Sequence, residues 1–241
     1  MKTVGEGRLD RTAALLGEDA LGRLRSAKAL VVGAGGVGGW CAEALARTGI
    51  GSITVMDDDM VAPSNLNRQC QALVSTLGQS KAEAMKARLK AISDDIEVTA
   101  DPRRYRTDAD YRELALFDVV IDAIDSVDCK AALILNAFEA GVPVVSSMGA
   151  AFRLDPTRVK TTRFDKVEGD GLAKALRMRL RKSGRRPGKF ECVWSDEPKV
   201  QCAGEGKGSV MQVTATFGMC LAAAAIKEIL KKWVNSRYSV I

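Results

Sequence analysis

A glycine-rich turn near the start of the chain constrains its fold more than any other feature. The apolar run at residues 27–32 predicts a short strand, and residues 40–48 predict a helix. Between them, Gly33, Gly35 and Gly38 fit G-x-G-x-x-G, the nucleotide-binding fingerprint of doubly wound α/β folds. The first glycine permits a tight turn, the second lets the backbone approach a phosphate, and the third lets the helix pack closely on the strand. The unpaired N–H groups at the start of this helix can then bind phosphate oxygens.

Apolar runs and segments of helical periodicity alternate after this turn. Strands are predicted at residues 52–56, 96–99, 117–122 and 142–147, and helices at 80–92 and 129–140. Alternation of this kind is typical of right-handed crossovers between parallel strands. We therefore expect an α/β fold with a Rossmann-like, doubly wound, mostly parallel sheet.

The pattern changes after Gly149, which predicts a C-terminal extension of extra strands and helices. Strands are predicted at residues 158–162 and 190–194, the first of them outside the parallel core, and helices at 172–181 and 210–230. The last helix is apolar, but its run is at the lower limit for crossing a bilayer and contains Gln212, Thr214 and Thr216. We expect a buried or dimer-interface helix and no stable membrane insertion.

The chain is predicted to be one domain, 1–241, with a nucleotide-binding core at about 8–150 and a substrate and dimerisation extension at about 151–241.

Composition excludes several kinds of chemistry. The chain has no histidine, so histidine acid–base catalysis and histidine metal sites are excluded. Six cysteines are scattered without a C-x-x-C pair, which indicates neither a zinc site nor a disulfide scaffold. The first residues lack the apolar core of a signal peptide, so a cytoplasmic location is expected. The formal charge of +6 modestly favours an anionic partner, but an ordinary basic cytosolic enzyme would have the same balance.

Acidic residues follow the second strand. Asp57 stands where one acid is expected to hydrogen-bond the ribose of a bound nucleotide. The chain continues as D-x-D-x-V-x-x-x-N-L-x-R-Q from Asp57 to Gln69, followed by G-x-x-K ending at Lys81. This ordered string resembles the ATP-binding core of the ThiF/MoeB and ubiquitin-activating-enzyme superfamily, whose members adenylate carboxylates.

The resemblance implies ATP and Mg²⁺ as cofactors and gives each matching residue a role. Gly36 would cradle the phosphates with the other turn glycines, and Asp57 would hold the ribose. The remaining nucleotide-binding residues implied by the string are Asp59, Asn65, Arg68, Gln69 and Lys81. Asp125, at the end of a predicted parallel strand, would bind the metal. Arg68, Lys81 and Asp125 form the implied catalytic set.

Arg8 resembles an N-terminal arginine that, in this superfamily, reaches the phosphates bound by the other subunit. That role requires a homodimer. Simpler interpretations remain open: Arg8 can be a solvated arginine, Lys81 a first-turn helix residue, and Asp125 a helix N-cap, as can Asp122 and Asp128.

Shorter strings resemble one family, the tRNA threonylcarbamoyladenosine dehydratases. They lie at residues 43–51, 121–127, 130–134, 149–150 with 155–157, 192–197 and 213–218, and the resemblance runs from about residue 8 to 230. It implies a ligase-type enzyme acting on N6-threonylcarbamoyladenosine in tRNA. The threonyl carboxylate would attack the α-phosphate of ATP, giving an acyl adenylate and pyrophosphate. Ring closure by the carbamoyl group would then expel AMP, with net loss of water.

Three other functions are weighed against this one. An activator of a ubiquitin-like sulfur-carrier protein would usually carry zinc-binding cysteine pairs, which are missing here. An NAD(P) oxidoreductase leaves the string from Asp57 to Lys81 unexplained, and a non-catalytic scaffold leaves the full set of polar residues unexplained.

The resemblance also points to further ligands and partners. A monovalent cation (Na⁺ or K⁺) and a cysteine desulfurase or sulfur-acceptor system remain open, and Cys192 is the cysteine that falls in a family string, unless it is a buried small residue. Basic residues at 177–186 can contact tRNA phosphates or form a solvated helix face, and the 181–190 loop is shorter than is usual in the family. Arg103, Arg104 and Arg106 are predicted to lie in a solvated loop.

Overall fold

The structure, a computed structural model, describes residues 7–201, 203–204 and 206–237, with side chains up to Lys231. The N-terminal residues used above for the signal-peptide prediction, and Cys202, lie outside this described part.

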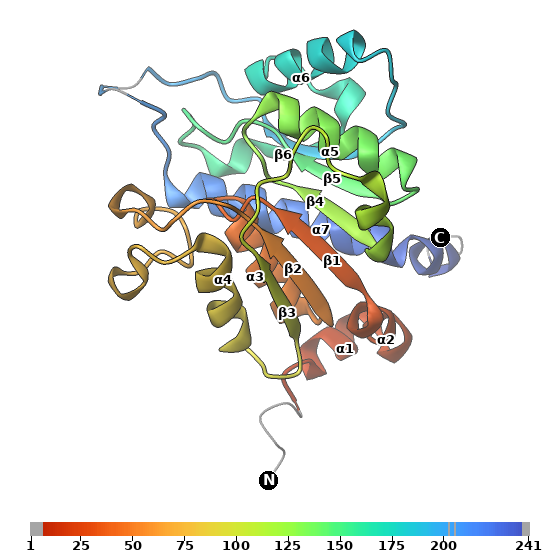
Figure 1. Ribbon diagram of the computed structural model, residues 1–241. Coiled ribbons are helices and arrows are strands. Elements are labelled where there is room, and N and C mark those ends of the chain that lie inside the picture. The colour runs from red at the N-terminus through yellow and green to blue at the C-terminus, as the bar shows by residue number, and fades with distance from the viewer. Residues whose placement is uncertain (1–6, 202, 205, 238–241) are drawn as a thin grey trace.

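A seven-stranded sheet forms the centre of the molecule (Figure 1). Its strands are β1 Lys28–Val32, β2 Ser52–Met56, β3 Glu97–Asp101, β4 Val119–Asp122, β5 Val144–Ser147, β6 Val159–Arg163 and β7 Glu191–Ser195. They are ordered β3-β2-β1-β4-β5-β7-β6, and every neighbouring pair is parallel except β6 with β7. The predicted doubly wound, mostly parallel fold is confirmed. The order reverses between β1 and β4, which is where such sheets bind ligands, beyond the carboxyl ends of the strands.

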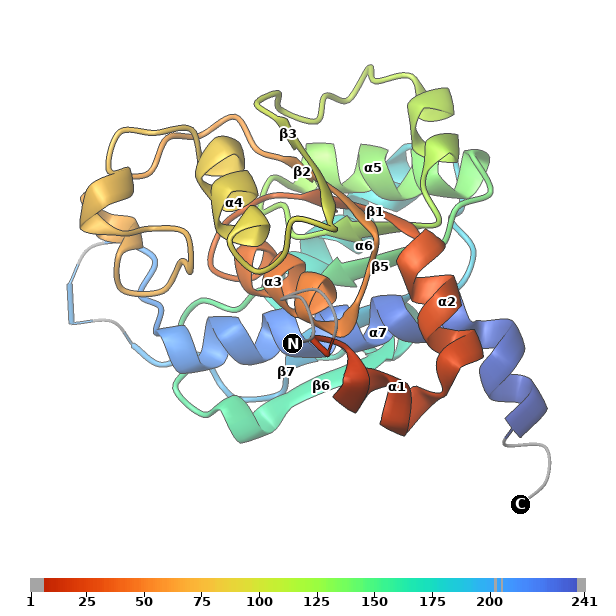
Figure 2. The same cartoon turned by 90° about the horizontal axis from the view of Figure 1, so that it is seen from below.

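Helices cover both faces of the sheet (Figures 1 and 2). They are α1 Asp10–Leu16, α2 Glu18–Ser26, α3 Gly38–Thr48, α4 Lys81–Lys90, α5 Val127–Glu139, α6 Gly171–Lys182 and α7 Met211–Arg237. Helices α2, α3, α4 and α7 pack on one face, and α5 and α6 on the other. Short 3₁₀ turns lie in the connections, at Pro63–Asn65, Val74–Thr76, Tyr111–Leu116, Pro156–Arg158 and Phe164–Lys166.

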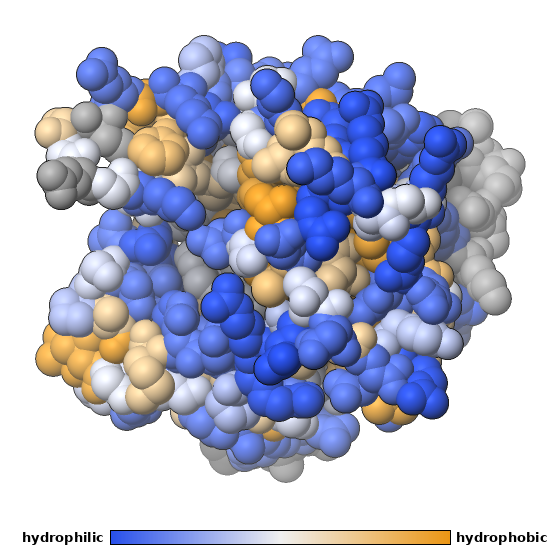
Figure 3. Space-filling model, turned by 45° about the horizontal axis from the view of Figure 1, so that its top comes forward, coloured by the Kyte–Doolittle hydropathy of each residue, from blue (hydrophilic) through white to orange (hydrophobic). Residues whose placement is uncertain are grey.

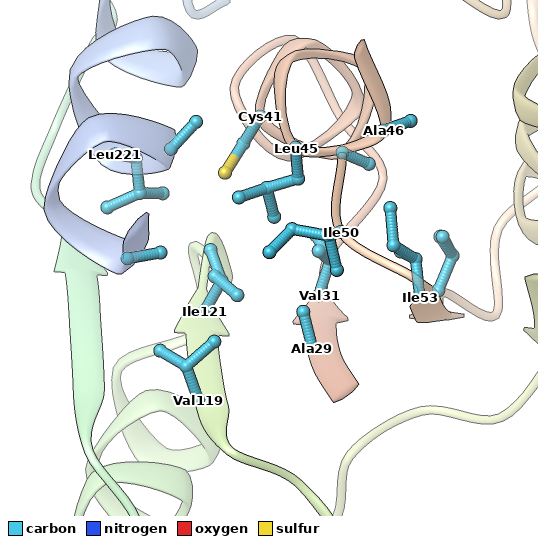
Figure 4. Packing of buried hydrophobic residues seen from close by; sticks show 14 of the residues in the cluster. Ala29, Val31, Cys41, Leu45, Ala46, Ile50, Ile53, Val119, Ile121 and Leu221 are labelled. Carbon is cyan, nitrogen blue, oxygen red and sulfur yellow. The ribbon is translucent and has the colours of Figure 1, made fainter. Parts of the chain in front are cut away.

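Alternate residues of each central strand enter different cores. Val31 and Ile121 point toward Leu45 of α3 and Leu221 of α7 in the first core (Figure 4). Their chain neighbours Leu30 and Val120 belong to the second core, on the face covered by α5 and α6. Because both faces are covered, the strands read as continuous apolar runs in the sequence rather than as alternating ones.

The long C-terminal helix is part of the first core. By length and composition, Met211–Lys231 is the one described helix that could cross a bilayer, but half of its apolar window is buried inside the molecule. Phe217 and Leu221 are fully buried between α3 and the sheet. This burial agrees with the prediction of a core helix. The helix runs past the predicted end at residue 230, because the lysines that follow the apolar run are good helix formers.

The C-terminal strands β6 and β7 extend the same sheet. The strand predicted at residues 158–162 is β6, and it stands outside the parallel part of the sheet, as predicted. Strand β7 pairs parallel with β5, and β6 returns antiparallel along β7 at the edge. The carboxyl end of β7 therefore lies in line with those of β1, β4 and β5, and the loops beyond it can contribute to the same site.

Candidate functional site

A cleft of about 590 Å³ runs along the carboxyl ends of the parallel strands. Its walls come from the glycine turn, the 57–69 segment and Lys81 on one side. On the other side they come from residues 147–152 and 170–172 and from Lys199, Lys207, Ser209 and Thr214. Figure 3 shows the molecule hollowed at the left. We call the part beyond β1, β2 and β3 the nucleotide half, and the part beyond β5 and β7 the distal half.

The glycine turn has the geometry that its sequence predicts. Gly33 has φ +95°, and a Cβ there would lie 2.7 Å from the carbonyl oxygen of Ala123. A Cβ on Gly38 would lie 1.7 Å from the carbonyl oxygen of Gly33, so only glycine lets α3 start this close to the strand. Gly35 lines the cleft and has nothing within 4 Å of its Cβ position, which leaves its backbone open to a ligand. Gly36 also lines the cleft, beside Arg68 and Thr214.

Asp57 ties the end of β2 to the glycine turn. Its Oδ2 accepts a hydrogen bond of 2.6 Å from the Ala34 N–H, and its Oδ1 accepts one of 2.9 Å from the Asp59 N–H. Burial raises the pKa of the Asp57 carboxyl, against the lowering effect of these two hydrogen bonds. Each carboxylate oxygen keeps a free lone pair for a ligand hydroxyl.

The rest of the predicted nucleotide-binding string lies in the same half of the cleft, where Asp59, Asn65, Arg68, Gln69 and Lys81 all line the wall. Lys81, at the start of α4, is buried, and its Nζ lies 2.7 Å from Oδ2 of the exposed Asp59. Arg68 is fixed by a 2.8 Å hydrogen bond from Nη1 to the Ser64 carbonyl. The side-chain oxygen of Asn65 accepts from the Ala62 N–H. The cations are thus held in place by the loop that carries them.

Asp125 projects into the cleft from the loop after β4. Its side chain is 84% exposed, and its Oδ2 lies 3.2 Å from Nζ of Lys207. It is not a helix cap, because Ser126 occupies the N-cap position of α5. The alternative of capping is also wrong for Asp122, whose carboxylate lies 2.7 Å from the fully buried Lys130, and for Asp128, which pairs with Arg179.

Two predicted residues lie outside the lining of this cleft. Gly38 contributes through packing, as described above. Arg8 lies toward the far end of α3, where its Nη1 donates a 2.9 Å hydrogen bond to the Ala46 carbonyl. Arg8 therefore does not reach the nucleotide half of its own chain.

Sequence reasoning missed several residues of the cleft. Arg103 and Arg104 line it, although their segment is the loop that the sequence predicts. Phe152, Lys199, Lys207 and Thr214 line it as well. No motif includes Phe152, although the family strings at residues 149–150 and 155–157 lie on either side of it in the sequence.

The other residues singled out from the sequence are buried or paired inside the fold. Cys192 is fully buried in β7, and burial raises the pKa of its thiol to about 12. Among the basic residues near α6, Arg177 donates to the carbonyls of Phe164 and Val167, and Arg185 pairs with Glu139. These arginines stabilise loops and do not face the cleft.

A family model described as the ThiF family matches residues 9–239. The chain belongs to the ThiF family. It is 38% identical to the tRNA threonylcarbamoyladenosine dehydratase of Escherichia coli, over 93% of this chain and 94% of that protein. It is 39% identical to the Bacillus subtilis protein of the same name, over 79% of this chain and 75% of that protein.

Solved structures of the E. coli dehydratase agree with the fold along its whole length. Its complexes with AMP and with ATP match this chain with TM-scores of 0.91 and 0.89. Each is 39% identical and covers 97% of this chain and 98% of its own. The match includes β6, β7 and α7, so the distal half of the cleft belongs to the shared fold.

Proposed function

We propose that this protein is an ATP-dependent tRNA threonylcarbamoyladenosine dehydratase, which cyclises the threonylcarbamoyl group through an adenylated carboxylate. One observation carries the proposal. Apart from Gly38, the residues between Gly33 and Lys81 that the resemblance marks for ATP line one cleft together with Asp125. Near-full-length similarity to the E. coli dehydratase, and to its ATP complex, supports the same substrate and cofactor.

In this proposal the nucleotide half binds ATP. The open backbone at Gly35 and Gly36 and the start of α3 face the phosphates, and Asp57 accepts from the ribose hydroxyls. Arg68 and Lys81 stabilise the charge that develops as the α-phosphate is attacked. Asn65 and Gln69 contact the nucleotide beside them, and Asp59 holds Lys81 in position through their 2.7 Å ion pair.

The acidic residues around the cleft suit Mg²⁺. The carboxylates of Asp57, Asp58 and Asp59 can bring one oxygen each within 4.8 Å of one another, and Asp125 is exposed in the same cleft. Mg²⁺ prefers one or two carboxylates together with phosphate oxygens and water, so these donors fit it. Asp125 is the proposed ligand, and a bound Mg²⁺ would screen the phosphate charge.

No enzyme nucleophile is required for the chemistry. The substrate carboxylate attacks phosphorus and pyrophosphate leaves. The carbamoyl oxygen or nitrogen of the same side chain then attacks the activated carbonyl, and AMP leaves. Because ring closure is intramolecular, the protein needs only to position the two groups and exclude water. A chain without histidine can therefore catalyse both steps.

A homodimer in the cytoplasm is the proposed assembly and location. Arg8 cannot reach its own nucleotide half, so a role at the phosphates needs Arg8 of a partner subunit. Exposed apolar side chains between residues 60 and 77 supply a surface that a second copy can cover, comprising Met60, Leu66, Leu73, Val74 and Leu77. A dependence on Na⁺ or K⁺, and a cysteine desulfurase partner, remain predictions to be examined once activity is established.

Mass spectrometry of tRNA nucleosides tests the proposed function. The protein is incubated with ATP, Mg²⁺ and tRNA that carries threonylcarbamoyladenosine, and we expect this nucleoside to lose one water. Omission of ATP, or Asp125→Ala, should abolish the loss. Asp128→Ala is the matched control, because Asp128 lies three residues away, is exposed and does not line the cleft. An unchanged nucleoside mass with folded, ATP-binding protein would refute the proposal.

A further inference from the structure

The distal half of the cleft has no role in the nucleotide assignments. It is lined by residues 147–152 after β5, by the start of α6, and by Lys199, Lys207 and Ser209 in the chain after β7. Its polar and apolar lining therefore remains free for the second substrate.

Phe152 is the feature of this half that most needs an explanation. It is the one described non-glycine residue with a positive φ, +65°, a conformation that is strained for a bulky side chain. Two backbone hydrogen bonds to the 196–210 segment hold it there. Its N–H donates to the Gly208 carbonyl, and its carbonyl accepts from the Val200 N–H, both at 2.9 Å. The fold thus maintains an unfavourable backbone conformation at a residue whose side chain lines the cleft.

The ring of Phe152 is the aromatic surface that the cleft can offer. The other aromatic residue among the described lining is Tyr105, which is 5% exposed and whose hydroxyl accepts a 3.0 Å hydrogen bond from Asn136. Phe152 is only half-buried, and its neighbours along the chain are alanine and the buried Arg153. A planar ligand entering the distal half therefore meets this ring.

A cation accompanies the ring. Nζ of Lys199 lies 5.4 Å from the centre of the Phe152 ring, and both side chains line the cleft. Lys199 is exposed, and no acidic partner is found for it among the described residues. Aromatic rings paired with lysine or arginine are a common means of binding unstacked RNA bases, because the ring stacks on the base while the cation attracts the phosphate.

We infer that Phe152 is the stacking surface for the adenine base of the target nucleoside, with Lys199 beside its phosphate. The inference rests on the proposed function. The threonyl carboxylate that must reach the α-phosphate is joined to N6 of this adenine by only a few bonds, so the base has to enter the same cleft. The nucleotide half is taken by ATP, which leaves the distal half for the base.

Phe152→Gly is the decisive variant. Glycine tolerates the positive φ without strain, so the substitution removes the ring while it keeps the backbone conformation of the loop accessible. Base–aromatic stacking is worth about 1–3 kcal/mol, so kcat/KM for tRNA should fall about 5- to 150-fold. The affinity for ATP, measured by calorimetry without tRNA, should stay within twofold of wild type. Phe152→Tyr keeps the ring and should keep most of the tRNA activity.

Tyr111→Ala provides the matched control, because Tyr111 is a partly exposed aromatic residue outside the cleft lining. It should leave both constants unchanged. The inference is overturned if Phe152→Gly turns over tRNA like the wild type, or if ATP affinity falls as much as tRNA activity. An inactive wild type would instead refute the proposed function itself, and the two failures are thereby distinguished.

Discussion

The two halves of the cleft are built in different ways. In the nucleotide half, residues from one continuous stretch, 33–81, are fixed by short hydrogen bonds such as Asp57 to Ala34 and Lys81 to Asp59. In the distal half, the ring of Phe152 comes from one loop and Lys199 and Lys207 from another, and the two loops meet through a few backbone bonds. The lysines there are largely exposed.

This difference matches what each half has to do in the proposed reaction. ATP is a small ligand with one chemical structure, so preorganised backbone and side-chain groups suit its binding. The arm of a tRNA is large and must enter and leave, so exposed cations and a ring on loops suit it better. The predictions that follow examine whether the halves are as independent as their construction indicates.

Lys130→Met should have the largest effect and should damage both halves together. Lys130 and Asp122 are fully buried, and Nζ also donates a 2.9 Å hydrogen bond to the Ser147 carbonyl, so the lysine joins the ends of β4 and β5 under the cleft. Removing it leaves an unpaired buried carboxylate, and unfolding free energy should fall by about 3–5 kcal/mol. Urea denaturation measures this. The double variant Lys130→Met with Asp122→Asn should recover part of the lost stability. If the two single losses simply add in the double variant, the two side chains are not energetically coupled.

Two alanine substitutions in the glycine turn should separate folding from binding. Gly38→Ala forces a Cβ to within 1.7 Å of a backbone carbonyl, which side-chain movement cannot relieve, so stability should fall by about 3 kcal/mol. Gly35→Ala meets nothing within 4 Å, so its melting temperature should be unchanged while ATP affinity drops. Thermal unfolding and calorimetric ATP titration give the two quantities. Equal destabilisation by both would mean that Gly35 serves packing and not the ligand.

Most of the residues that line the nucleotide half can be found from the sequence, because they are close together in the chain and obey local rules. Strand β2 ends at Met56 as predicted, and the string from Asp57 to Lys81 folds back onto one wall. A glycine spacing and a strand-end acid, together with the ordered string that follows them, are local patterns that the sequence displays directly.

The distal half could not be predicted in the same way. Its residues are brought together by the addition of β7 beside β5, a pairing between segments about 45 residues apart that no local pattern encodes. The positive φ of Phe152 cannot be read from the sequence either, since a phenylalanine normally has a negative φ. Burial of Cys192 and the internal pairing of Arg177 likewise depend on tertiary contacts.

Lys207→Met should change tRNA binding while stability stays the same. The pair of Lys207 with Asp125 is exposed, at 71% and 84%, so its loss should change unfolding free energy by less than about 0.5 kcal/mol. If Lys207 meets a tRNA phosphate, the slope of log affinity against log salt should shrink by about 0.7–0.9. Fluorescence anisotropy with labelled tRNA over a KCl series measures the slope. Lys90→Met, on α4 away from the cleft, is the control. Weaker ATP binding with an unchanged slope would place Lys207 in the nucleotide half.

Substitution of Cys192 should have the smallest effect. The rate at which its thiol is labelled reports whether β7, the strand below the distal half, separates from its neighbours. With a pKa of about 12, the thiol is ionised in on the order of one molecule in ten thousand at pH 8. Because no part of it is exposed, a thiol reagent should modify Cys192 only after denaturation, whereas the partly exposed Cys220 should react earlier. Peptide mass spectrometry after timed labelling distinguishes the two sites.

Cys192→Ala should keep the rate of dehydration within twofold of wild type and lower the unfolding free energy by about 1 kcal/mol. Native labelling at the rate of Cys220 would show that β7 separates from its neighbours in solution. The loops beyond β7 would then be mobile together with the strand, and a sulfur-transfer partner could reach this cysteine.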